Sequence, residues 1–378
     1  MKTVYFDNAA TTYPKPPSVK NALVNAVDRY GGNPGRGGHI YSYNAAEMVY
    51  TVRSLAADMF SASPENVVFT QNCTHALNLC IKGMLKPKDR LIISSMEHNS
   101  VARPAYALSK NGVRVDVATV GKSDRETLES FSKLMTSSVK CVVCTAASNV
   151  TGRVMPIREI GEMCKKRGVC FIVDGAQACG IIPIKLSDGI NFICTAGHKG
   201  LYGTTGTGLL ISDGAYTPST IIEGGTGATS AELEQTGVMP ELLESGTVNT
   251  VGIASLGAGI RYVNQMGMDN IFSHEEELCR IMVDGLSKIE GVTVYRRGER
   301  FVPIVSFNIE GIPAPSLAEA LSQKGFALRG GLHCAFLSHR TLNTLPDGTV
   351  RFSPSVFNSE KEVVSLIDTV KKFSKDGL

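Results

Sequence analysis

Short apolar runs alternate with amphipathic stretches along the chain from about residue 18 to residue 250. The runs have the length of single strands and are apolar almost throughout, which indicates burial on both faces. They occupy residues 65–70, 89–94, 113–118, 140–146, 169–175, 190–196 and 206–212. Between them, apolar residues recur at helical spacing in residues 45–60, 73–84, 124–135 and 155–167. This alternation predicts an α/β fold with a mainly parallel, seven-stranded sheet flanked by helices.

The pattern changes after residue 250, where two long helical stretches precede shorter strands and helices. Helices are expected at residues 252–267, 272–289, 315–323 and 359–374, and strands at 292–296, 302–310, 326–329 and 349–352. Such a mixture predicts a smaller α+β domain. We therefore expect a large α/β domain over residues 15–250 and a small domain formed by residues 1–14 and 251–378.

Charge and hydropathy exclude several classes of partner. The 378 residues carry a formal net charge of +3, and the charged residues, 19% of the chain, form neither a basic cluster nor an acidic tail. A small-molecule partner is therefore expected rather than a nucleic acid. No apolar run approaches the roughly 18–20 residues that a membrane helix needs, and the first residues lack the apolar segment of a signal peptide. We expect a soluble, cytoplasmic protein.

Nine of the ten cysteines are expected to be reduced core residues, because most lie inside apolar runs. Cys141 and Cys144 have the spacing of a zinc-binding pair, but no second pair follows them. Residues three apart on a strand also point to opposite faces. We therefore expect no metal site.

Lys199 and Asp174 are the first candidates for chemistry. Lys199 lies in a Gly-rich loop between two apolar runs, and Asp174 ends another run, where parallel strands present side chains to a ligand crevice. Each residue alone has an ordinary alternative, a solvated loop lysine and a helix N-cap. Together they fit pyridoxal 5′-phosphate, which needs an amine to form a Schiff base and an acid beside its ring nitrogen. Thr74 lies at a strand-to-helix turn suited to a phosphate, although it also fits a helix cap.

Eight short motifs occur in order along nearly the whole chain: YFDNAATT, NPGRGGH, MEHNS, SNVTG, VDGAQ, AGHKGLYG, SGTVNT and RGGLHCA. With them the sequence resembles the class V aminotransferase superfamily, in its cysteine desulfurase and selenocysteine lyase branch. The resemblance implies a fold type I enzyme that depends on pyridoxal phosphate. It also implies Lys199 as the Schiff-base lysine and His98 as the residue that stacks on the ring and relays protons.

The resemblance assigns further cofactor contacts. Asp174 would pair with the ring nitrogen, Gln177 would donate to the phenolic oxygen, and Asn149 would contact the substrate side of the ring. Thr74, the neighbouring backbone at Cys73, and His198 would hold the phosphate. Thr247 would reach the phosphate of a partner subunit, which implies a homodimer with shared active sites.

The resemblance also implies substrate contacts and a sulfur acceptor. Arg351 would bind the substrate α-carboxylate, since a guanidinium forms two parallel bonds with a carboxylate, while Arg329 and Arg36 match positions at the mouth of the site. Cys334 follows His333 in polar surroundings, and adjacent positive charge favours a reactive thiolate. The implied reaction converts L-cysteine to L-alanine, with sulfur held on Cys334 as a persulfide and passed to an acceptor protein or a reductant.

Two departures from the family pattern keep alternatives open. Ala196 stands where the family often has a hydroxyl residue, with Thr195 before it, and the segment 336–350 differs from the common desulfurase version. The main prediction is a cysteine desulfurase. A selenocysteine lyase, a class V aminotransferase in which Cys334 is incidental, and a non-catalytic scaffold are the alternatives.

Overall fold

Seven strands form the larger sheet in the computed structural model of the chain, which describes residues 3–35, 37–227, 230–296 and 298–378. Their order is β2-β8-β7-β6-β5-β3-β4, and all run parallel except β8, which is antiparallel to both neighbours. The predicted α/β fold is confirmed, since each of the seven apolar runs contains one strand. The strands are β2 (Val67–Thr70), β3 (Arg90–Ser94), β4 (Arg114–Ala118), β5 (Val139–Thr145), β6 (Cys170–Asp174), β7 (Phe192–Ala196) and β8 (Gly208–Ser212).

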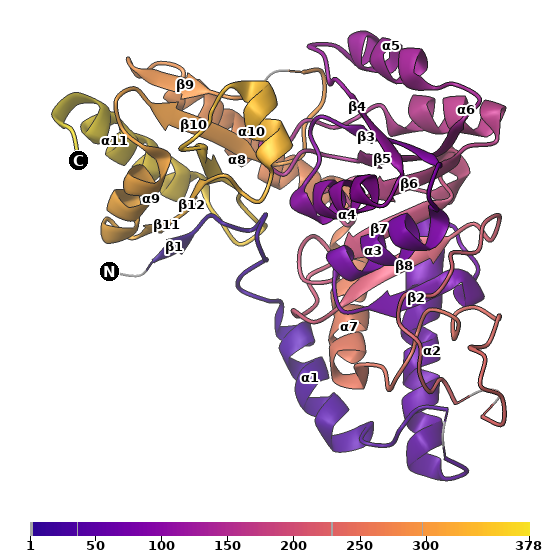
Figure 1. Cartoon of the computed structure of the whole chain (residues 1–378). Coiled ribbons are helices and arrows are strands. Elements are labelled where there is room, and N and C mark those ends of the chain that lie inside the picture. Colours follow the sequence, from indigo (N-terminus) through magenta and orange to yellow (C-terminus); the bar gives the residue numbers. More distant parts are fainter. Residues whose placement is uncertain (1–2, 36, 228–229, 297) are drawn as a thin grey trace.

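Helices cover both faces of this sheet (Figure 1). One apolar cluster joins the sheet to α3 and α4, and a second joins its other face to α2, α5, α6 and α7. Cys141 packs in the first cluster and Cys144 in the second, which confirms that the two thiols point to opposite faces. The helices are α1 (Pro17–Arg29), α2 (Ile40–Phe60), α3 (Cys73–Met84), α4 (Asn99–Lys110), α5 (Asp124–Leu134), α6 (Ile157–Arg167) and α7 (Thr250–Met266), and short 3-10 turns lie at Pro64–Asn66 and Leu186–Asp188.

A four-stranded antiparallel sheet, ordered β12-β13-β10-β9, lies beside the larger one. It packs on helices α8, α9 and α11 around an apolar cluster of its own. Helix α10 was not predicted, because it lies in the divergent segment and is only seven residues long. The elements are β9 (Val292–Val294), β10 (Val305–Ile309), β12 (Arg329–Gly331), β13 (Thr349–Phe352), α8 (Met268–Leu286), α9 (Ala314–Gln323), α10 (Phe336–Leu342) and α11 (Glu360–Asp376).

The N-terminal segment runs along the smaller sheet and then to the larger one. Strand β1 (Val4–Tyr5) pairs in parallel with β11 (Phe326–Ala327), and Asp7 bridges Ser353. Five residues later, the amide of Thr12 donates to the carbonyl oxygen of His198 at 3.1 Å. Figure 1 shows the indigo segment continuing from there into α1. The division at residues 14/15 and 250/251 stays a prediction.

We searched the helices in the described part of the chain for a candidate membrane span and found none. None of its helices combines the length and the apolar composition that a bilayer span requires.

Candidate active site

A cavity of about 230 Å³ lies at the carboxyl ends of the parallel strands. Asp174 is the last residue of β6, and Lys199 follows the end of β7 by three residues. Parallel sheets place ligand sites at this edge because the connecting loops converge there. The structure brings most of the predicted site residues to this cavity, namely Cys73, Thr74, His98, Asn149, Asp174, Gln177, His198, Lys199, Arg329 and Arg351.

The carboxylate of Asp174 is buried and fixed on one side. Its Oδ1 accepts a hydrogen bond from the amide of Ala176 at 3.0 Å and from the thiol of Cys73 at 3.3 Å. Burial, reinforced by the nearby carboxylate, raises the pKa of the Cys73 thiol well above its usual value. Cys73 therefore remains a neutral donor, and Asp174 keeps its second oxygen for a ligand in the cavity.

Lys199 is partly buried, and its turn is held by backbone and side-chain donors. The amide of Tyr202 donates to the Lys199 carbonyl oxygen at 2.8 Å, and the Lys15 ammonium donates to the His198 carbonyl oxygen, also at 2.8 Å. Burial, aided by the Arg351 guanidinium, lowers the pKa of the Lys199 amine. Since the neutral amine is the nucleophile, this environment suits a Schiff-base lysine.

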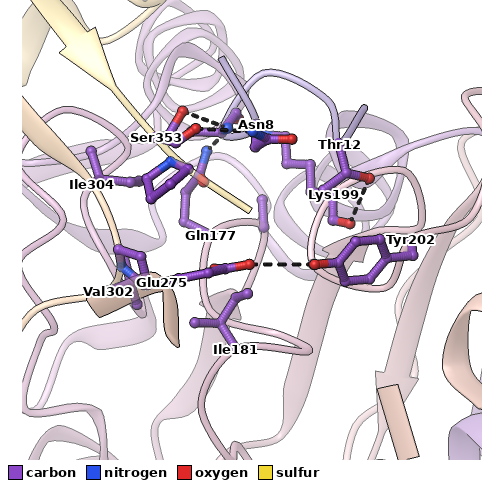
Figure 2. Close-up of a pocket in the computed structure, with 15 residues that line it drawn as sticks. Asn8, Thr12, Gln177, Ile181, Lys199, Tyr202, Glu275, Val302, Ile304 and Ser353 are labelled. Atoms are coloured by element: carbon purple, nitrogen blue, oxygen red, sulfur yellow. Dashed lines mark hydrogen bonds between the residues drawn. The ribbon is translucent and has the colours of Figure 1, made fainter. Parts of the chain in front are cut away.

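A second, smaller cavity of about 40 Å³ shares Lys199 and Gln177 with the first (Figure 2). There Glu275 of α8 accepts a hydrogen bond from the Tyr202 hydroxyl at 3.3 Å, and burial raises the pKa of Glu275 to about 8. Sequence reasoning missed this residue, which is one of three consecutive glutamates. The signal was its spacing from Leu278 and Met282, which places it on the buried face of the helix.

Two of the three histidines that line the cavity, His98 and His198, are neutral, because burial lowers the pKa of each to about 4. His98 precedes α4 and accepts from the Ser100 amide through Nδ1 at 3.0 Å. Nδ1 of His198 is buried without a partner in the described structure. Glu97, next to His98, accepts from the Thr145 amide at 2.8 Å, and burial raises its pKa to about 8.

The N-terminus of α3 faces the same cavity through Asn72, Cys73 and Thr74. Asn72 caps the helix by accepting from the His75 amide at 2.9 Å. The first-turn amides of a helix lack intrahelical acceptors and carry partial positive charge. Together with the Thr74 hydroxyl, they form a donor set suited to a phosphate.

Gln177 and Arg351 are tied to the N-terminal segment. Gln177 donates from Nε2 to the Ala9 carbonyl oxygen at 3.0 Å. The buried guanidinium of Arg351 donates to Oδ1 of Asp7 at 2.7 Å and to the Asn149 carbonyl oxygen at 3.0 Å. Its Nε has no partner among the described residues, as is also true of Asn149 Oδ1.

Cys334 is the exposed cysteine, and the other nine are buried as predicted. His333 and Cys334 both have left-handed backbones, with φ of 49° and 55°. The cation nearest the thiol differs from the expected one, because Arg329 Nη2 lies 3.7 Å from Cys334 Sγ. His333 instead turns inward, where Nε2 contacts the Thr349 carbonyl oxygen at 2.8 Å and burial holds its pKa well below the usual value.

Two further predicted positions among the described residues, Cys334 and Thr247, do not belong to the lining of this cavity. Cys334 is at its rim, in the loop that supplies Arg329 and His333 to the lining. Thr247 lines a different cavity of about 260 Å³ and accepts from Asn33 Nδ2 at 3.3 Å. Arg36 lies outside the described residues. At the departure noted above, Ala196 lines the main cavity, while the Thr195 hydroxyl donates to the Gly175 carbonyl oxygen at 3.5 Å.

Comparisons with known proteins agree with this geometry. The family pattern described as Aminotransferase class-V matches residues 4–366. A probable cysteine desulfurase of Xylella fastidiosa (strain Temecula1) is 31% identical, over 98% of this chain and 91% of its own. One of Synechocystis sp. is 32% identical, over 99% and 92%. An apo structure of a cysteine desulfurase from Thermococcus onnurineus NA1 matches with a TM-score of 0.88 at 29% identity, over 100% of this chain and 95% of its own.

Proposed function

Because the chain belongs to the class-V aminotransferase family, we propose that it is a pyridoxal-phosphate-dependent cysteine desulfurase. It would convert L-cysteine to L-alanine, hold the sulfur on Cys334 and pass it to an acceptor. The observation that carries the proposal is one cavity that contains a partly buried lysine and a buried carboxylate, with an exposed cysteine beside an arginine at its rim.

The residues of the cavity fit the cofactor. Lys199 offers the amine, Asp174 offers a free carboxylate oxygen, and the α3 N-terminus with Thr74 offers phosphate donors. Four buried polar atoms without partners in the described structure lie on residues of the same cavity, namely Asn149 Oδ1, His198 Nδ1, His333 Nδ1 and Arg351 Nε. When bound, pyridoxal phosphate supplies an electron sink for the pair left at the substrate Cα when its proton departs.

The protein's own groups then have distinct tasks. The Lys199 amine, whose pKa is lowered by burial, takes and returns protons at the substrate carbons. Arg351 binds the α-carboxylate through Nε and its remaining N–H groups. His98 covers the cavity and excludes water from the reacting atoms.

Sulfur transfer belongs to Cys334. Its thiolate, 3.7 Å from the Arg329 guanidinium, attacks the substrate sulfur, and a new S–S bond forms as the Cβ–S bond breaks. In net terms, the Cys334 thiol and cysteine become the Cys334 persulfide and alanine, so atoms and electrons balance. An acceptor thiol can then take the outer sulfur by attack on the same bond.

A homodimer is part of the proposal. Thr247 lies apart from the cavity of its own chain and in a separate cavity beside Gln71 and His75 of the α3 turn. This position is compatible with a hydroxyl that reaches the phosphate of a partner copy.

Product analysis tests the proposed function. Purified protein given L-cysteine and a reducing thiol should release alanine and sulfide in equal amounts. Cys334→Ala should reduce sulfide to background while it keeps the cofactor's visible absorption band. Cys279→Ala, at a buried thiol outside the cavity, is the matched control. Sulfide release by Cys334→Ala at the wild-type rate would contradict the proposal.

The same assay separates the two catalytic alternatives. Amino transfer to a 2-oxo acid that is indifferent to Cys334→Ala would indicate an aminotransferase. Fast release of selenium from selenocysteine, with almost no turnover of cysteine, would indicate a selenocysteine lyase.

A further inference from the structure

Arg351, which we propose to bind the substrate carboxylate, already forms an ion pair with a carboxylate of the protein, that of Asp7. Arg351 is 1% exposed, and Asp7 contacts its Nη2 at 2.7 Å, while Nη1 donates to the Asn149 carbonyl oxygen. The buried Nε has no partner in the described part of the chain. The guanidinium is thus oriented by Asp7 and Asn149 and keeps donors for a ligand in the cavity.

Asp7 approaches Arg351 from outside the cavity, since it does not belong to the lining. Its position is fixed by the neighbouring backbone. The Asn8 side chain donates to the Ser353 carbonyl oxygen at 3.0 Å, and the Ala9 amide donates to the Ser353 hydroxyl at 2.9 Å. A ligand carboxylate can therefore bind Arg351 without displacing Asp7, and the two anions then share one cation.

We propose that Asp7 is a resident counter-ion that weakens the hold of Arg351 on α-carboxylates and so favours release of L-alanine. The inference rests on the proposed function. Substrate and product carry the same α-carboxylate, so a strong hold on one is a strong hold on the other. A buried arginine without a counter-ion would bind either anion tightly, because little solvent screens the pair. With Asp7 in place, part of that attraction is cancelled before the ligand arrives.

Asp7→Asn separates charge from geometry. The amide oxygen can still accept from Nη2, so the guanidinium stays oriented, but the negative charge is gone. At a separation of about 7 Å and an effective dielectric constant near 20, one like charge weakens anion binding on the order of 10- to 100-fold. The variant should therefore bind L-alanine on the order of 10- to 100-fold more tightly than wild type.

The experiment is an absorbance titration of the cofactor-loaded protein with L-alanine, with dissociation followed by stopped flow. Tighter binding and slower dissociation are expected for Asp7→Asn, while Asp7→Glu, which keeps the charge, should bind like wild type. Asp124→Asn is the matched control, because Asp124 pairs with the equally buried Arg153 outside the cavity. Its alanine affinity should not change. Thermal unfolding of the cofactor-free proteins reports the structural cost of each change separately.

Equal or weaker alanine binding by a folded Asp7→Asn protein overturns the inference, because an anchoring role alone would give that result. If Asp7→Asn does not fold, Asp7→Ser removes the same charge with a smaller side chain and is judged by the same criterion. Failure of the proposed function looks different, since no amino acid would then perturb the visible band of the wild-type protein.

Discussion

Two regions of the cavity each contain a cysteine. Cys73 and Asp174 lie on its floor, at the strand ends, and Cys334 lies at its rim, in the loop of Arg329. The two thiols have different electrostatic surroundings. Cys73 lies on the floor beside the Asp174 carboxylate, and burial, reinforced by that carboxylate, keeps the thiol protonated. Cys334 is exposed at the rim, and its nearest cation is the Arg329 guanidinium. An adjacent anion suppresses a thiolate and an adjacent cation supports it. Under the proposed function, the molecule can therefore keep a thiol inside the cavity while the sulfur is transferred to the thiol at the rim.

The largest expected effect comes from removing the Lys199 amine from the cavity while Cys334 at the rim is left unchanged. Lys199→Ala should lower alanine formation by on the order of 10³-fold or more, because the proton-transferring amine is lost, and the visible absorption band should be absent. Alkylation of Cys334 should continue at the wild-type rate in the cofactor-free proteins. Exposed Lys165→Ala is the control. A visible band in Lys199→Ala would show that another amine holds the cofactor.

The second-largest expected effect is a pH dependence of folding stability that arises from Glu97, next to the cavity residue His98. Burial raises the pKa of Glu97 in the folded protein to about 8. The stability that the protonated Glu97 contributes to the folded state is therefore complete below the unfolded pKa of about 4.5, and it is lost as the pH rises through 8. Glu97→Gln should remove up to about 5 kcal/mol of this pH dependence. Urea unfolding of the cofactor-free protein at pH 5 and pH 8 measures it.

Some of the slope should survive in Glu97→Gln, because burial raises the pKa of Glu275 in the same direction. Exposed Glu319→Gln should keep the wild-type slope. An unchanged slope in Glu97→Gln would mean that Glu97 is ionised in the folded protein.

The smallest expected effect is at the rim. Arg329→Gln should slow alkylation of Cys334 by several-fold near neutral pH, since the thiolate loses its neighbouring cation. Mass spectrometry of the Cys334 peptide gives the rate, and Arg340→Gln, on the adjacent helix α10, is the control. If the rates are equal, the environment of Cys334 does not depend on Arg329, and the contrast with Cys73 rests on exposure alone.

The larger sheet and the floor of the cavity could be predicted well from the sequence. Each strand is a continuous apolar run, and the carboxyl ends of parallel strands meet at one edge of the sheet. Asp174 and Lys199 could be placed together on that basis. Helix α4 was missed, since its short sequence contains Pro104, and the strand predicted at 302–310 begins only at Val305, after Pro303.

Contacts between distant segments could not be predicted. The pairing of Asp7 with Arg351 joins residues 344 positions apart, and no periodicity signals it. The cation beside Cys334 was assigned to the adjacent His333, but the left-handed backbone turns that imidazole inward and leaves Arg329, five residues earlier, next to the thiol. Sequence adjacency was a poor guide wherever a loop reverses direction.

The N-terminal segment also affects the order in which the protein can be completed during synthesis. Val4 and Tyr5 are synthesised long before their strand partner, Phe326–Ala327, and Asp7 long before its partner, Arg351. The nascent chain can form the larger sheet long before these partners exist. The Asp7–Arg351 pair therefore forms only after Arg351 has been made, so a chain stalled before that point could fold its larger sheet and still lack the arginine proposed to bind an amino acid.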